Sequence, residues 1–145
     1  MEETRYEDRV LAALSHVSVI VYFMGQIVPI VIWATHKDRS KYVRFQALQA
    51  AVFQLTLILV FMGGMFAYMG SFFVMMFLGV ATGGEEAMSI LFIIPFGIMA
   101  LIMLAYLVFI VYGVYGAYST YHGRDFRYAV IGDRLFERLE REAGN

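Results

Sequence analysis

Strongly polar side chains are rare in the apolar parts of this 145-residue sequence, so each one is a candidate functional group. His16 stands near the start of the first apolar stretch, and Gln26 stands further along it. Gln46, Gln49 and Gln54 open the second stretch, and on a helix they fall within about 140° of one another as a polar stripe. The stripe predicts either amide hydrogen bonds between helices or a hydrophilic groove for a passing polypeptide or another polar substrate.

His16 and the proline that follows it each allow two interpretations. The imidazole could relay a proton or contact a substrate, or it could hydrogen-bond another helix or lie at the headgroup level. Pro29 removes a backbone hydrogen bond and clashes with the carbonyl of Gly25, which predicts a kink or an unwound turn between these residues. The freed carbonyls could line a polar cavity, or a neighbouring helix could pack over the break.

The sequence carries no recognisable catalytic motif. It has no cysteine, no glycine-rich phosphate loop, no HExxH zinc pair and no serine in a nucleophile elbow. Apolar residues make up 61% of the sequence and charged residues 16%. In soluble domains the apolar fraction is about 45–50% and the charged fraction about 25%. We therefore expect a non-enzymatic membrane protein with no catalytic residue, cofactor or metal, surrounded by lipid. The formal net charge of −1 argues against a nucleic-acid partner.

Three stretches without Asp, Glu, Lys or Arg must position these polar residues: 10–35, 45–84 and 87–123. Each is longer than the roughly 20 residues that cross a hydrocarbon core, and a backbone in lipid must satisfy its own hydrogen bonds, so each predicts a helix. We expect an all-α integral membrane protein. Its predicted spans cover about residues 10–35, 45–69 with an extension to 81, and 88–113.

The number of spans depends on the second stretch, which as one helix would reach about 60 Å, twice the hydrocarbon thickness. It either tilts or folds back at Gly63-Gly64. With three spans, the four cations of residues 37–44 share a side with the five of the tail, against two at the N-terminus. The positive-inside rule therefore favours a bundle of three transmembrane helices over four. We expect it in the prokaryotic plasma (inner) membrane, multi-pass, with a cytoplasmic C-terminus.

Residues 1–123 are thus predicted to form the bundle and residues 124–145 a charged cytoplasmic tail. Asp133 can cap a helix in that tail, which is predicted to be amphipathic and to lie on the membrane surface or to dock a partner. The apolar stripe of this helix consists of Ile131, Leu135, Phe136 and Leu139. Small residues at helical spacing predict close packing within the bundle or an oligomer, and they are Gly63, Ala67, Ser71, Gly113 and Ala117.

The order of several short motifs resembles a small bacterial membrane-protein family of unknown function, related to the twenty-kilodalton component of the chloroplast inner-envelope translocon. The motifs are ALSH at residues 13–16, the Lys37-Asp38 loop, VRFQALQA at residues 43–50 and FRYAVIGDRL at residues 126–135. The resemblance implies an all-helical bundle with a role in moving or assembling proteins in a membrane. The candidates it marks are His16, Arg44, Phe45, Gln46, Gln49 and Asp133.

Three functions follow from these observations. The first is an accessory or channel-like component in protein translocation or membrane-complex assembly, in contact with other membrane-protein subunits. The second is a small oligomeric solute or ion channel or transporter that uses the break at Gly25 and Pro29, and the third is a structural subunit of a larger complex. The residues expected to face a groove or partner are His16, Gln26, Arg44, Phe45, Gln46, Gln49, Gln54 and Asp133.

Overall fold

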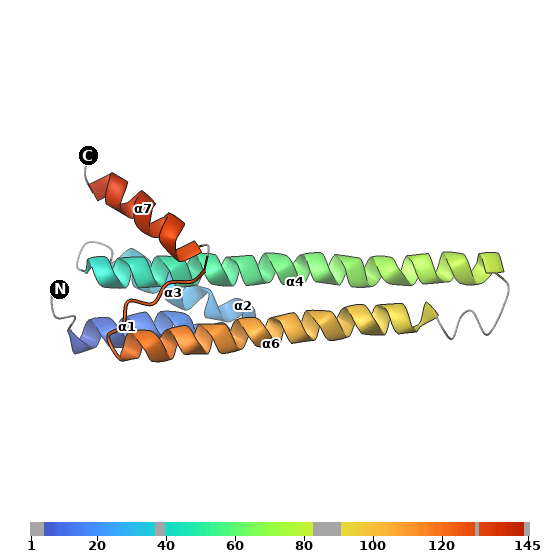
Figure 1. Cartoon of the computed structure of the whole chain (residues 1–145), viewed down its shortest axis with the longest axis horizontal. Coiled ribbons are helices and arrows are strands. Elements are labelled where there is room, and N and C mark those ends of the chain that lie inside the picture. The colour runs from blue at the N-terminus through green and yellow to red at the C-terminus, as the bar shows by residue number, and fades with distance from the viewer. Residues whose placement is uncertain (1–4, 37–39, 83–90, 130, 144–145) are drawn as a thin grey trace. The chain divides into compact units, whose positions relative to one another are not determined.

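The computed structural model describes residues 5–36, 40–82, 91–129 and 131–143, and within these ranges every regular element is a helix. The all-α fold class is therefore confirmed. The elements are α1 (Tyr6–Val17), the 3₁₀-helix η1 (Ser18–Val21), α2 (Tyr22–Gly25), α3 (Ile27–His36), α4 (Lys41–Thr82), α6 (Ile93–Tyr121) and α7 (Ile131–Ala143) (Figure 1).

Two helices are long and apolar enough to cross a membrane by length and composition, Lys41–Ala81 within α4 and Ile93–Tyr121. The sequence predicted three or four spans. The predicted first span, residues 10–35, is not one helix, because it changes to a 3₁₀-helix at Ser18–Val21 and is interrupted again at Gln26. The described residues thus supply two candidate spans.

Residues 45–82 of the second apolar stretch lie in one uninterrupted helix, the 42-residue α4, which does not fold back at Gly63-Gly64. Glycine lowers helix propensity by only about 1 kcal/mol per residue, and α4 contains no proline, which is the residue that breaks helices. Pro95 lies in the first turn of α6, where the missing N–H has no intrahelical partner to lose.

The chain divides into two compact units. Unit 1 comprises residues 1–56 and 110–145, so it contains the first part of α4, the last part of α6 and all the other helices. Its apolar core joins α3 to α4 through Ile32, Val43 and Ala47, with Trp33 packed against them. Unit 2 comprises residues 57–109, which are the remainder of α4 and α6 and the segment between them.

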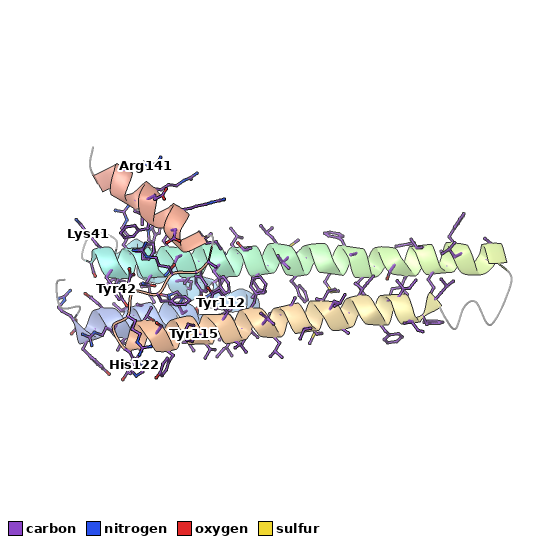
Figure 2. All side chains as sticks on the ribbon, in the orientation of Figure 1. Lys41, Tyr42, Tyr112, Tyr115, His122 and Arg141 are labelled. Carbon is purple, nitrogen blue, oxygen red and sulfur yellow. The ribbon has the colours of Figure 1, made fainter. Side chains whose placement is uncertain are left out.

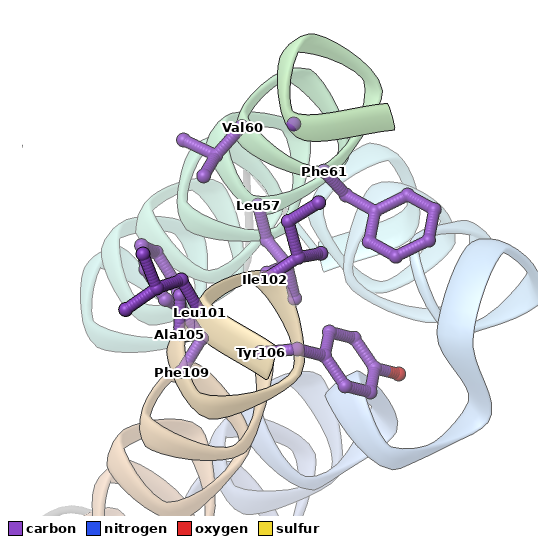
Figure 3. A pocket seen from close by; sticks show the side chains of 9 residues that line it. Leu57, Val60, Phe61, Leu101, Ile102, Ala105, Tyr106 and Phe109 are labelled. Atoms are coloured by element: carbon purple, nitrogen blue, oxygen red, sulfur yellow. The ribbon is translucent and has the colours of Figure 1, made fainter. Parts of the chain in front are cut away.

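Unit 2 exposes many large apolar side chains, including Phe66, Phe77 and Leu101. Its two helices approach closely at Gly64, where an added Cβ would lie 2.9 Å from Cγ1 of Ile102. Beside this contact is an apolar groove (Figure 3), lined by Leu57, Val60, Phe61, Gly64, Leu101, Ile102, Ala105, Tyr106 and Phe109.

The small residues predicted to mediate packing lie in different surroundings. Gly63 has nothing within 4 Å of an added Cβ, and Ala67 is exposed, whereas Ser71 is buried and its hydroxyl donates to the carbonyl of Tyr68 at 2.6 Å. In unit 1, Gly113 and Ala117 are buried, and an added Cβ at Gly113 would lie 2.7 Å from Cγ1 of Val19. Close helix packing therefore occurs at Gly113 and Gly64, next to the predicted position Gly63.

Candidate functional site

The most concentrated group of buried polar side chains lies in unit 1 and joins three parts of the chain. His16 comes from α1, Gln46 and Gln49 come from the second turn of α4 and the turn after it, and Tyr128 comes from the segment between α6 and α7. The first three are fully buried and Tyr128 is 1% exposed. We call these four residues the polar cluster.

Both nitrogens of the His16 ring have partners in the polar cluster. Nδ1 lies 2.9 Å from the hydroxyl of Tyr128, and Nε2 lies 3.1 Å from Oε1 of Gln46. An amide oxygen only accepts, so Nε2 donates to Gln46 and Nδ1 accepts from the Tyr128 hydroxyl. The imidazole is therefore held as one neutral tautomer.

The two glutamines of the polar cluster converge on one backbone carbonyl. The amide nitrogen of Gln46 donates to the carbonyl of Phe126 at 3.1 Å, and that of Gln49 donates to the same oxygen at 2.7 Å. Gln49 also donates to Oε1 of Gln46, and its own oxygen accepts the backbone N–H of Tyr128 at 3.3 Å. Side chains of α4 thus satisfy the carbonyl of Phe126 and the N–H of Tyr128, both in the non-helical segment after α6.

Aromatic rings pack around the polar cluster. Tyr128 stacks on Phe53 with ring centroids 3.9 Å apart, and Phe126 meets the His16 ring edge to face at 5.4 Å. Burial, and then the neighbouring Tyr112, raise the pKa of the Tyr128 hydroxyl above its ordinary value. The cluster therefore favours the neutral phenol that donates to His16.

Two glycines bring the Phe126 segment to this position. Gly123 has φ +74°, a left-handed conformation that ends α6 and reverses the chain. Gly116 leaves room for the Phe126 ring, because an added Cβ would lie 2.7 Å from Cε1 of that ring.

The third glutamine of the stripe makes a separate contact. The amide nitrogen of Gln54 donates to the carbonyl of Ser15 at 3.1 Å and to the hydroxyl of Ser18 at 3.0 Å. Its buried oxygen has no hydrogen-bond partner among the described residues. Gln54 therefore holds the end of α1 where the chain changes to the 3₁₀-helix.

The other predicted groove residues lie outside the polar cluster. Gln26 is partly exposed at the helix interruption, and Arg44 is partly exposed on α4. Phe45 is buried and meets the ring of Phe136 edge to face at 5.5 Å. Asp133 is exposed and pairs with Arg127.

The sequence predicted that Pro29 leaves the carbonyl of Gly25 itself without a hydrogen-bond donor. The structure shows a second feature at this break, which is that Gly25 lies against the carbonyl of Ser18. An added Cβ at Gly25 would lie 1.9 Å from the carbonyl oxygen of Ser18. The chain can turn here only because residue 25 has no side chain.

Sequence reasoning missed Tyr128, Phe126 and Arg127. All three lie in the run at residues 126–135, where the pattern of an aromatic and a basic residue suggested a motif but not a partner. Arg127 pairs with Asp125 at 3.0 Å and with Asp133 at 3.3 Å, and its guanidinium lies 4.0 Å from the centroid of Phe136. These contacts dock α7 on the Phe126 segment.

The polar cluster is built to hold the chain together. None of its four residues is a carboxylate, although the amide nitrogen of Gln46 also lies 3.5 Å from Oδ1 of Asp125. Its one titratable pair, His16 and Tyr128, is engaged by hydrogen bonds within the cluster. Across the described ranges, no three His, Asp or Glu side chains gather as metal ligands.

Comparison of the sequence with known protein families identifies one match. Residues 7–136 match the model of the magnetosome magnetite crystal formation protein family (MamF/MmsF). The chain belongs to this family. No curated protein and no solved structure was found to match the chain. Membership implies a bacterial membrane protein, in a lipid environment, that is involved in magnetosome magnetite formation.

The predicted resemblance to the translocon-related family is therefore wrong. The residues that suggested it, from 13–16 to 126–135, lie inside the region that matches the magnetosome family. Short polar and aromatic runs beside apolar helices are common at membrane interfaces, so their order did not discriminate between families.

Proposed function

We propose that this protein is a non-enzymatic membrane component of magnetosome magnetite formation, which acts by assembling with other membrane proteins or with copies of itself. The observation that carries this proposal is the saturation of the polar cluster. A solute path needs polar groups that face water or substrate, whereas His16, Gln46 and Gln49 are fully buried and bond to one another and to the Phe126 segment.

The outer surface supports the same proposal. The helices of unit 2 present large apolar side chains over most of their length, and the groove beside Gly64 is lined almost entirely by apolar residues. Such surfaces suit lipid tails and the faces of other membrane helices. We infer that the protein contributes contacts within the membrane around the growing mineral and does not carry out chemistry on it.

The test compares crystal formation with protein stability. In a magnetosome-forming bacterium that lacks its own copy of this protein, the chain is supplied as wild type, as the double variant Gln46→Leu with Gln49→Leu, or as Gln26→Leu, which changes a glutamine outside the polar cluster. We expect the double variant to lower both the amount of folded protein and its Tm in detergent, and crystal size and number to change in proportion. Gln26→Leu should resemble wild type in every measurement.

Two results would contradict the proposal. One is solute or ion flux through the purified wild-type protein in vesicles that is absent in protein-free vesicles. The other is a double variant with wild-type Tm and abundance that nevertheless fails to restore normal crystals, because the glutamines would then act on something other than the fold.

A further inference from the structure

We propose that residues 8–36 form a re-entrant hairpin, which enters one leaflet of the lipid bilayer and returns to the side from which it came. The N-terminus, the start of α4 and the C-terminal tail then share one side of the membrane. The sequence had indicated a crossing at residues 10–35, with the N-terminus on the opposite side.

The first observation is that Asp8, at the start of the segment, contacts Ser40, which directly precedes α4. The hydroxyl of Ser40 donates to Oδ2 of Asp8 at 3.1 Å, and the same hydroxyl accepts the backbone N–H of Val43 at 3.3 Å. Asp8 lies in the first turn of α1, and Val43 lies in the first turn of α4. A segment that crossed the bilayer would separate these two turns by about 30 Å of hydrocarbon.

The end of α6 lies beside the first turns of α1 and α4. The hydroxyl of Tyr42 lies within hydrogen-bonding distance of two carbonyl oxygens, that of Thr120 at 3.4 Å and that of Arg124 at 3.3 Å. Figure 2 shows Lys41, Tyr42 and His122 near one another in unit 1. The ring of Tyr6 lies 6.3 Å from that of Tyr121. The first turn of α1, the start of α4 and the end of α6 therefore form one face of unit 1.

The chain reverses between these ends. α1 and α3 pack against each other, with the turn formed by η1, α2 and the interruption at Gln26. The close approach of Gly25 to the Ser18 carbonyl makes this turn tight. α3 has 10 residues, about 15 Å of helix, which is half the hydrocarbon thickness.

The outside of the hairpin indicates what surrounds it. Large aliphatic side chains around the turn are between 46% and 68% exposed, namely Ile20, Val21, Met24, Ile27, Ile30 and Val31. No charged residue occurs between positions 10 and 35. This surface continues the apolar character of the two candidate spans, and acyl chains are the surroundings that cover it without an energetic cost.

The distribution of charge provides an independent argument. A crossing at residues 10–35 leaves Arg5 and Arg9 opposite the other nine Lys and Arg residues. With the hairpin, all 11 Lys and Arg residues lie on one side, and the segment between α4 and α6 carries only the acidic pair Glu85 and Glu86. The positive-inside rule therefore favours the hairpin and makes the shared side cytoplasmic.

The test uses single cysteines, which are clean reporters because the chain has none. Cysteine replaces Glu7 or Arg5 at the start of the hairpin, Lys41 at the start of α4, and Met24 or Ile27 at the turn, all of which are exposed. Glu86→Cys reports the far side of α4, and Arg134→Cys reports the tail. Sealed membrane vesicles of both orientations are treated with a membrane-impermeant maleimide, and Trp33 emission checks that each full-length variant is folded.

We expect Glu7→Cys, Lys41→Cys and Arg134→Cys to react in the same vesicle orientation and Glu86→Cys in the other. Met24→Cys should resist the maleimide in both, and a spin label there should be broadened by lipid-phase oxygen and not by an aqueous relaxant. Reaction of Glu7→Cys and Lys41→Cys in opposite orientations would overturn the proposal. The proposal would also be overturned if Glu7→Cys and Lys41→Cys reacted on the same side but the aqueous reagents reached Met24→Cys. The hairpin would then lie outside the lipid. The outcome does not depend on whether the protein affects magnetite.

Discussion

The hydroxyl of Tyr128 lies 2.9 Å from Nδ1 of His16, and the opposite nitrogen of the same ring lies 3.1 Å from Oε1 of Gln46. One neutral imidazole thus joins the segment after α6 to α4, with each ring nitrogen in a defined role. This arrangement makes the effect of single substitutions in unit 1 predictable.

His16→Ala should destabilise the protein by about 2–4 kcal/mol, because it opens a cavity and leaves the buried hydroxyl of Tyr128 without its acceptor. Thermal unfolding in detergent, followed by the emission of Trp33 in unit 1, measures the loss. The matched control is His122→Ala, since His122 is exposed and contacts Tyr118 and Tyr121 in the last turn of α6. Equal Tm values for the two variants would show that the His16 contacts do not stabilise the fold.

Tyr128→Phe should cost about 1 kcal/mol, because it removes one hydrogen bond but keeps the ring stacked on Phe53. Tyr128→Ala should cost several times more, since the stacked ring is lost as well. A larger loss for the phenylalanine than for the alanine variant would contradict this order.

Stability should fall in alkaline solution. The pKa of Tyr128 is raised in the folded protein, so the folded state binds the phenolic proton more tightly than the unfolded state does. The contribution of this group is constant below the ordinary tyrosine pKa of about 10 and is lost as the pH rises above it toward the folded value. Tm measured between neutral pH and pH 11 should show this decline, and Tyr128→Phe should reduce its slope. An unchanged slope in the variant would assign the decline to other groups.

Gly25→Ala and Gly63→Ala should have opposite effects. An added methyl at Gly25 would meet the Ser18 carbonyl at 1.9 Å, so the turn must shift, at a cost of about 1–3 kcal/mol. The same change at Gly63 meets nothing within 4 Å and should gain up to about 1 kcal/mol of helix propensity. The difference in Tm between the two variants checks the prediction, and a stabilising Gly25→Ala would contradict the tight turn.

Arg127→Ala should loosen α7 without unfolding the remainder of unit 1. It removes the ion pairs with Asp125 and Asp133 and the contact with the Phe136 ring, each worth up to about 1 kcal/mol where partly exposed. Hydrogen exchange should become faster in α7 and stay unchanged in α1. Arg134→Ala, an exposed change on the same helix, is the control and should leave both rates as they are.

The part of this architecture that sequence could predict is the part set by neighbouring residues. Apolar stretches of sufficient length predict helices, and helical spacing puts Gln46 and Gln49 on one face, where both now reach the carbonyl of Phe126. Neither observation depends on what lies elsewhere in the chain.

The remainder depends on contacts that no local pattern encodes. Nothing in the residues around Tyr128 indicates that its hydroxyl meets His16. The sequence predicts that residues 10–35 cross the membrane because this charge-free stretch is long enough to do so. The interruption at Gln26 lies where Gly25 and Pro29 predict one, but the local pattern does not indicate that the chain then returns and brings Asp8 to Ser40. Family membership had to come from the pattern of the whole chain, since short interfacial motifs suggested the wrong relative.

The contact between His16 and Tyr128 closes a loop of 112 residues. During synthesis, α1 and the glutamines of α4 are made long before Tyr128, so the ring of His16 lacks one of its native partners until that residue is added. We therefore expect a chain that terminates before Tyr128 to lack the contact that completes unit 1.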